Sequence, residues 1–373
     1  MKWNAPAKWA FYRWLSRRRR PTASPYRPVG IYKADRLGDF VLALGAIRQI
    51  VDREGTENCV LIIAPYAREI ARHEFPEIEQ AVVEPWHANL GALLRYCQTH
   101  SNERIFAEGV GKLICLRHNR LFSENVVCGR IPAGESWAVA NSHLSREPGQ
   151  WISSKPWDHE FHRFESRNGE TKDFSRHRAV LAGYFGCPAD TLDVTPRMTA
   201  RAMPLQSHVV VSPFGSAVVR DFPVNLLAAA GRHVWNRFQW RLRLLSPPGD
   251  ETRYRDLIAQ LGQLGVPAVE LSTCRSISNL IDSIFESRLV LSVETATAHI
   301  AAALDKPMVA LLGGGHYGWF APWRRTQRQE WVSHKVVCYH CNWECIHPEP
   351  ICLTRIPEAE LTASISAVLA AAI

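Results

Sequence analysis

A short polar turn joins an apolar, β-rich run to a helix-forming segment late in the chain. Residues 294–299 follow the run 289–293, residues 300–304 favour a helix, and a second apolar run, 308–312, ends in three glycines. This order predicts the strand–turn–helix–strand unit of a parallel sheet. Free N–H groups at the helix start, among small side chains, suit a phosphate or diphosphate. The alternative is an ordinary turn that binds nothing.

Two other stretches lie at the same kind of position, where a strand ends. Residues 30–33 form an expected strand that leads through a Gly-Asp pair into an apolar helical stripe, and residues 208–212 lead through Ser-Pro-Phe-Gly-Ser to an arginine. A cation and hydroxyls suit a diphosphate, and a carboxylate suits a general base. The residues with this chemistry are Lys33, Gly38 and Asp39 in the first stretch and Ser212, Ser216 and Arg220 in the second.

Each of these side chains also has a purely structural interpretation. Asp39 could cap the helix that follows it, since Asp is a favoured N-cap residue. Arg220 could be an ordinary surface charge, and His299 could pack against its apolar helix. Lys33 could hydrogen-bond locally.

The periodicity of apolar residues predicts an α/β fold in two halves. We expect strands at 30–33, 60–64, 80–84, 112–116, 208–212, 242–246, 269–271, 289–293 and 308–312, and helices at 40–54, 65–73, 89–100, 178–185, 225–240, 250–264, 276–287, 300–304 and 357–373. From about residue 129 to 174 the pattern fades, and the aromatics there favour an ordered, partly open surface over a disordered insertion. Residues 195–206 are the expected linker.

These elements predict two Rossmann-like domains that face each other across a cleft, with ligand at the carboxyl ends of the strands. The expected boundaries are a basic aromatic tail at 1–26, an N-terminal Rossmann-like domain at 27–195, a C-terminal Rossmann-like domain with a cysteine cluster at 205–356, and a terminal helix at 357–373. The length of 373 residues is consistent with two or three domains.

The N-terminal tail carries much of the formal charge of +8. Its basic residues, including the run 17–20, alternate with aromatic ones, and it contains neither an acidic residue nor a secretory h-region. Such a segment suits the surface of an anionic membrane, with a disordered tail as the alternative and nucleic acid not expected. No apolar run reaches the length of about 20 residues that crosses a bilayer.

Four of the ten cysteines are clustered. Cys338, Cys341, Cys345 and Cys352 have the spacing C-x2-C-x3-C-x6-C, and four thiolates so close together suit tetrahedral zinc or iron in a structural role. The alternative is a loop of free thiols. Without a signal peptide, the cysteines imply a reducing compartment.

The three turns together resemble those of glycosyltransferase family 9, the heptosyltransferase-like enzymes of GT-B fold. Lys33, Gly38 and Asp39 match the opening motif, although Gly45 stands where the helix usually carries proline. Arg220 stands for the family's lysine before Trp-Pro, with Phe222 for the tryptophan. The third motif, Asp-Thr-Gly-x-x-His in the family, is matched here at Thr295 and His299, with Glu and Ala departures at 294 and 296; its residues are Glu294, Thr295, Ala296, Thr297, Ala298 and His299.

The resemblance implies an inverting, metal-independent sugar transfer from a nucleotide donor, with ADP-heptose favoured, and no cofactor required for catalysis. Asp39 would be the base. Ser212, Ser216, Arg220 and residues 294–299 would bind the donor, while Lys33 and Gly38 would lie at the acceptor. The acceptor would be a lipopolysaccharide or related glycolipid at the inner face of the cytoplasmic membrane.

Two alternatives stay open under the same resemblance. The acceptor could be a protein such as an autotransporter, since some related enzymes hold iron in a cysteine-rich tail. The chain could also be a catalytically silent nucleotide-sugar-binding protein.

Overall fold

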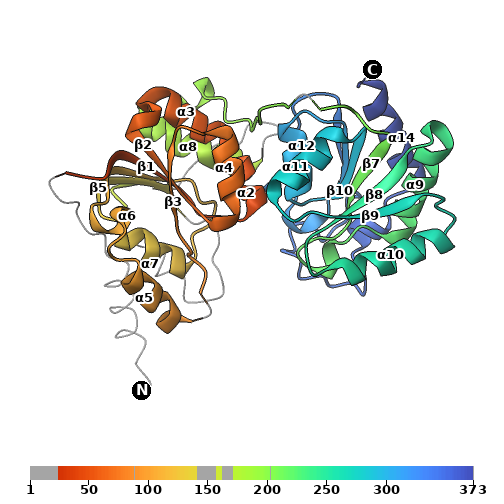
Figure 1. The fold of residues 1–373 in the computed structure, drawn as a ribbon, viewed down its shortest axis with the longest axis horizontal. Helices are drawn as coiled ribbons and strands as arrows, with labels where there is room; N and C mark the ends of the chain where they lie inside the picture. Colours follow the sequence, from red (N-terminus) through yellow and green to blue (C-terminus); the bar gives the residue numbers. More distant parts are fainter. Residues whose placement is uncertain (1–23, 88, 141–156, 162–170, 202, 373) are drawn as a thin grey trace. The chain divides into compact units, whose positions relative to one another are not determined.

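Two compact α/β units make up the described chain in a computed structural model (Figure 1). The structure describes residues 24–87, 89–140, 157–161, 171–201 and 203–372. The first unit extends to Val194 and the second begins at Thr195, except that Thr171 and Lys172 group with the second. The basic run of the predicted tail lies outside the described residues.

The first unit is built on a six-stranded parallel sheet in the order β3-β2-β1-β4-β5-β6. Its strands are β1 (Arg27–Lys33), β2 (Cys59–Ile63), β3 (Glu79–Val82), β4 (Val110–Cys115), β5 (Ala133–Val139) and β6 (His159–Phe161). Its helices are α2 (Leu37–Leu42), α3 (Leu44–Glu54), α4 (Arg68–Glu74), α5 (Leu90–Thr99), α6 (Arg104–Ala107), α7 (Phe122–Arg130) and α8 (Lys172–Phe185), with short 3-10 turns η1 (Thr56–Asn58), η2 (Pro65–Ala67) and η4 (Ala189–Thr191).

The second unit repeats this plan with a parallel sheet in the order β12-β11-β10-β7-β8-β9. Its strands are β7 (His208–Ser212), β8 (Arg241–Ser246), β9 (Val269–Thr273), β10 (Leu289–Val293), β11 (Met308–Leu311) and β12 (Gln329–Val332). Its helices are α9 (Val224–Phe238), α10 (Glu251–Gln263), α11 (Ile277–Glu286), α12 (Ala296–Ala303), α13 (Ile351–Thr354) and α14 (Glu358–Ala370), with 3-10 turns η5 (Val218–Arg220) and η6 (Gly314–His316).

The central strands explain why both sheets are parallel and covered. Every residue of β2 and of β10 is buried, and both read as nearly continuous apolar runs. Strands that lose water on both faces need such runs, because helices pack against each side of the sheet. In the second unit, helices α9, α10 and α14 pack their apolar side chains against these strands to form one core.

Both sheets reverse their strand order at one place, and that place fixes where ligands fit. The reversal falls between β1 and β4 in the first unit and between β7 and β10 in the second. At such a switch point the connections leave in opposite directions, which opens a crevice at the carboxyl ends of the strands. Each of the three predicted turns follows a strand that borders one of these crevices, namely β1, β7 or β10.

Several elements differ from the sequence-based expectation. The predicted helix 40–54 is two helices that meet at Ala43, and strand β12 and helix α7 were not foreseen. In the region of weak periodicity, Trp137 and Trp157 are buried rather than part of an open surface. Trp151 lies outside the described residues. In the described parts of the chain, none of the helices combines the length and apolar character needed to cross a bilayer.

Candidate functional site

The turn after β10 presents the start of a buried helix at the switch point of the second unit. Helix α12 has Thr295 at its N-cap position in extended conformation, and the first intrahelical bond runs from the N–H of His299 to the carbonyl of Thr295 (3.2 Å). The N–H groups of Ala296, Thr297 and Ala298 therefore precede the helical hydrogen bonds. Their positive dipole end suits an anion.

Hydroxyl groups fix the shape of this turn. The Oγ of Ser292 lies 3.0 Å from the Oγ1 of Thr295, 3.4 Å from the carbonyl oxygen of Ser212, and donates to the carbonyl of Val293 (2.7 Å). The Thr295 side chain makes no capping hydrogen bond to the helix, and its hydroxyl contacts Ser292 instead. Ser292 thus links the ends of the neighbouring strands β7 and β10.

Arg220 joins the two turns that border the switch point. Its Nη1 donates to the hydroxyl of Ser216 (2.9 Å), and its Nη2 donates to the carbonyl oxygen of Glu294 (2.9 Å) and lies 3.3 Å from the Glu294 carboxylate. Gly215 allows this approach, since a Cβ there would lie 2.5 Å from the Cβ of Arg220. These contacts contradict the alternative interpretation of Arg220 as an ordinary surface charge.

Glu294 is the buried acid of this site. Its side chain is 6 % exposed, and burial raises the pKa of its carboxyl group to about 7, against the opposing attraction of Arg220. A carboxyl group that changes charge near neutral pH can accept a hydrogen bond from a sugar hydroxyl when it is ionised and donate one when it is protonated.

His299 is held by aromatic packing, as its structural alternative expects. The ring is buried between Trp323 and Trp331, with centroid distances of 6.2 and 5.6 Å, and its Nδ1 accepts a hydrogen bond from the Trp323 indole (3.2 Å). That acceptor role leaves the proton of a neutral imidazole on Nε2.

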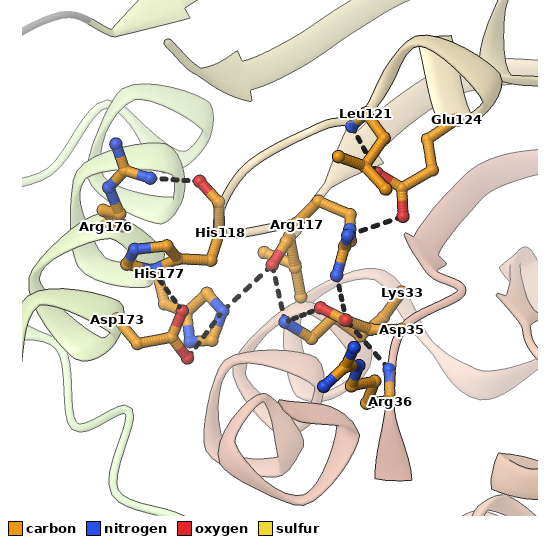
Figure 2. Close-up of polar contacts among 11 residues, drawn as sticks. Lys33, Asp35, Arg36, Arg117, His118, Leu121, Glu124, Asp173, Arg176 and His177 are labelled. Atoms are coloured by element: carbon orange, nitrogen blue, oxygen red, sulfur yellow. Dashed lines mark hydrogen bonds and ion pairs between the residues drawn. The ribbon is translucent and has the colours of Figure 1, made fainter. Parts of the chain in front are cut away.

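The end of β1 is held by buried charges in the first unit (Figure 2). Lys33 is fully buried; its Nζ donates to the carbonyl of Leu116 (3.0 Å) and lies 3.1 Å from the carboxylate of Asp35. Arg117 pairs with Asp35 and, at 2.6 Å, with Glu124. Lys33 was expected at the acceptor; its contacts in the structure are with Leu116 and Asp35 and hold the turn in place, and its place at the acceptor stays a prediction.

A second cluster of buried groups packs beside Lys33. Asp173 accepts a hydrogen bond from Nδ1 of His118 (2.9 Å) and lies 3.7 Å from Nε2 of His177, which itself donates to the carbonyl of Leu116 (3.1 Å). Burial acts to raise the pKa of Asp173, but the nearby His177, Lys33 and His118 outweigh it and hold that pKa well below its usual range. Burial lowers the pKa of His118 to about 4.

Asp39 lies in the first turn of α2 with a half-buried side chain. The helix begins at Leu37 and has Arg36 at its N-cap position, so the alternative interpretation of Asp39 as the N-cap residue does not hold. Gly38 precedes it within the same turn. The buried charges of Lys33, Asp35, Arg117 and Glu124 hold the three residues that connect β1 to this turn. They therefore fix the position of the Asp39 carboxylate.

Sequence reasoning missed these supporting charges. Arg117 and His118 follow β4, which pairs with β1 in parallel, so their position across the switch point could have been inferred from the strand order. Asp173 begins a helix in the region of faint periodicity, and no pattern in the sequence connects it to Lys33.

The cysteine cluster lies beside the donor turn. All four predicted cysteines and His347 line one small cavity with Tyr339 and Trp343. Trp343 also stacks on the Arg220 guanidinium at 5.0 Å and covers Gly313 and Gly315, where a Cβ would lie within 2.4 Å of its ring. Within the described residues, no three Cys, His, Asp or Glu side chains are already arranged as metal ligands.

Comparison with known proteins places these features in a known class. The architecture is the GT-B fold, and residues 167–346 match the family model described as glycosyltransferase family 9 (heptosyltransferase). That range contains Ser212, Ser216, Arg220 and the turn 294–299, whereas Asp39 precedes it. A comparison with curated proteins finds no match.

Solved structures with the same fold extend over nearly the whole chain. A family 9 glycosyl transferase from Veillonella parvula has a TM-score of 0.67 at 13% identity, covering 94% of this chain and 99% of its own. The E. coli heptosyltransferase WaaC with ADP-2-deoxy-2-fluoro heptose has 0.63 at 15%, covering 91% and 98%. The iron-containing dodecameric glycosyltransferase TibC from enterotoxigenic E. coli has 0.53 at 10%, covering 94% and 78%.

The family match and the fold together confirm the predicted resemblance to glycosyltransferase family 9. Residues 167–346 thus match a family of glycosyltransferases, and the chain has the fold of solved members of that family.

Proposed function

We propose that the protein is an inverting transferase that moves a heptose from ADP-heptose to a saccharide of a lipopolysaccharide or related surface glycan. The observation that carries the proposal is the contact of Arg220 with Ser216 and Glu294 at the start of α12. A guanidinium and free N–H groups in one place can stabilise the charge that builds on a departing diphosphate. The bound heptose in the WaaC structure supports this donor.

In this proposal Glu294 binds a hydroxyl of the donor sugar or ribose. The buried carboxyl group accepts when ionised and donates when protonated, so it can pair with a hydroxyl in either state. Thr297 is also buried in the first turn of α12 and supplies an N–H group. His299 anchors helix α12 through its hydrogen bond with Trp323.

Asp39 is the proposed base that takes the proton of the acceptor hydroxyl. A positioned base contributes about 10²–10⁴-fold to rate. Attack then proceeds on the face of the sugar opposite the leaving diphosphate, which inverts the anomeric centre.

The decisive experiment combines donor binding with transfer. Thermal shifts with ADP-, UDP-, GDP- and CMP-sugars identify the donor, because a ligand of the folded state raises its melting temperature. Asp39→Asn should lose transfer at least about 100-fold while keeping the donor-induced shift. Asp52→Asn, an exposed acid on α3, is the matched control and should keep both. Donor binding without transfer by the wild type would instead indicate a silent binding protein.

We further propose a structural zinc or iron ion at the cysteine cluster. The cavity brings the four cysteines and His347 together, and the Nε2 of His347 is buried there without a hydrogen-bond partner. Soft thiolates with one imidazole fit either metal. A bound ion would fix the loop that carries Trp343 over Arg220 and would take no part in the transfer step.

Metal analysis of the purified protein tests this site. Protein expressed with added iron or zinc should contain about one ion per chain, and Cys341→Ser should lose it and melt at a lower temperature. Cys187→Ser, a half-buried cysteine of the first unit, should change neither. Equal metal content in all three proteins would contradict the site. Iron together with higher oligomers in solution would favour the alternative of a protein acceptor.

A further inference from the structure

Two exposed aromatic side chains stack on each other in the first unit. Among the large apolar side chains of the described residues, Tyr66 is 36 % exposed and Trp86 is 37 % exposed. Their rings are 5.9 Å apart and almost parallel, at 5°. A stacked aromatic pair at the carboxyl ends of two strands offers an apolar surface on which a ligand can pack.

The strand order places this pair in a row with Asp39. Asp39 follows β1, Tyr66 lies in η2 directly after β2, and Trp86 follows β3. These three strands are successive neighbours in the sheet, β1 beside β2 and β2 beside β3, all parallel. Their carboxyl ends therefore lie along one edge, about 5 Å apart.

The packing of their elements and an electrostatic influence place Tyr66 near Asp39. Helix α2, which carries Asp39, packs against η2, which carries Tyr66. Burial raises the pKa of the Tyr66 phenol above its ordinary range, and the Asp39 charge raises it further while Arg36 opposes it. The phenol is a protonated hydroxyl donor that the charges of both Asp39 and Arg36 influence.

We propose that Tyr66 and Trp86 form an aromatic platform that binds the ring of the acceptor saccharide. This inference rests on the proposed function, because it assigns the platform to the sugar whose hydroxyl reaches Asp39. The C–H faces of a pyranose carry slight positive charge and pack on the negative faces of aromatic rings, while its hydroxyls stay in water. Arg36 adds an exposed cation at the same edge, so an anionic sugar complements it.

Fluorine NMR tests the binding step without requiring the natural acceptor. The chain has 13 tryptophans, and the Trp86 signal in protein labelled with 5-fluorotryptophan is assigned by its loss in Trp86→Phe. Methyl glucuronide at millimolar concentration should shift this signal, and Tyr66→Ala should weaken the shift. Octanoate has the same charge without a sugar ring, and it should leave the signal unmoved. A response to octanoate instead would indicate a surface for acyl chains and overturn the platform.

Kinetics test the assignment to the acceptor. Trp86→Ala should raise the acceptor KM about tenfold, with the donor KM and the slow hydrolysis of the donor unchanged, and Trp86→Phe should recover most of the loss. Trp240→Phe, a stacked tryptophan of the second unit, is the matched control. A fall in kcat or a rise in donor KM, with the acceptor KM unchanged, would overturn the inference.

The outcomes separate this inference from the proposed function. Sugar transfer by the wild type with no response at Trp86 to glucuronide, and no change of acceptor KM in Trp86→Ala, would remove the platform alone. A glucuronide response at Trp86 in a wild-type protein that transfers no sugar would remove the proposed function and, with it, the assignment to an acceptor.

Discussion

Replacing Glu294 by glutamine should make the free energy of unfolding less dependent on pH. The folded state holds the Glu294 proton more tightly than the unfolded chain, because burial raises the pKa of this group from 4.5 to about 7. Below pH 4.5 Glu294 is protonated in both the folded and the unfolded state, so it does not lower the free energy of unfolding. As pH rises through this interval, the unfolded chain releases the proton first and the folded protein loses stability.

The magnitude follows from the two pKa values. A difference of one pKa unit corresponds to about 1.36 kcal/mol, so the interval from 4.5 to about 7 represents about 3 kcal/mol in total. Between about pH 5 and 7.5, we expect the free energy of unfolding of the wild type to fall by about 2 kcal/mol relative to Glu294→Gln.

Urea denaturation of both proteins across this pH range measures the difference. Subtracting the two curves cancels the other titrating groups, since a single side chain distinguishes the proteins. A flat difference for Glu294→Gln, or one that rises with pH, would refute the reasoning from burial.

Three further substitutions test local packing at two glycines and the buried charges beside Lys33. Gly314→Ala should destabilise the protein by about 1–3 kcal/mol in thermal unfolding, because its Cβ would lie 2.2 Å from the Tyr339 ring. Gly262→Ala should instead raise the melting temperature, since no atom lies within 4 Å of its added Cβ in helix α10 and alanine favours helix by about 1 kcal/mol. Asp173→Asn should cost about 3–5 kcal/mol of unfolding free energy, because it removes the buried negative charge that faces His118, His177 and Lys33, and an unchanged urea midpoint would contradict the network.

The sequence predicted the parts of the fold that depend on local pattern. The apolar runs of β2 and β10 and the small residues of the 294–299 turn indicated buried parallel strands and a helix start, and the structure has both. The sequence placed Arg220 and Glu294 after the ends of strands, but the pairing of β7 with β10, which brings the two residues together, came only from the structure.

Contacts between distant segments were beyond that reasoning. Asp173 reaches Lys33 and His118 across more than fifty residues, through a region whose periodicity is faint. Trp343 packs on Gly315 and Arg220 because three glycines leave room for its indole, which the Gly-Gly-Gly run alone does not specify. Likewise, no period in the sequence relates Tyr66 to Trp86; their pairing follows from the order of strands.

The guanidinium between the two turns of the second unit has a consequence for acid–base behaviour. An arriving pyrophosphate would compete with Glu294 for Arg220, and a carboxylate that loses its cation in a buried place takes up a proton more readily. Donor association would then be coupled to proton uptake near neutral pH. Calorimetric titration in buffers of different ionisation heat would reveal it as an enthalpy that changes with the buffer, and an identical enthalpy in every buffer would exclude it.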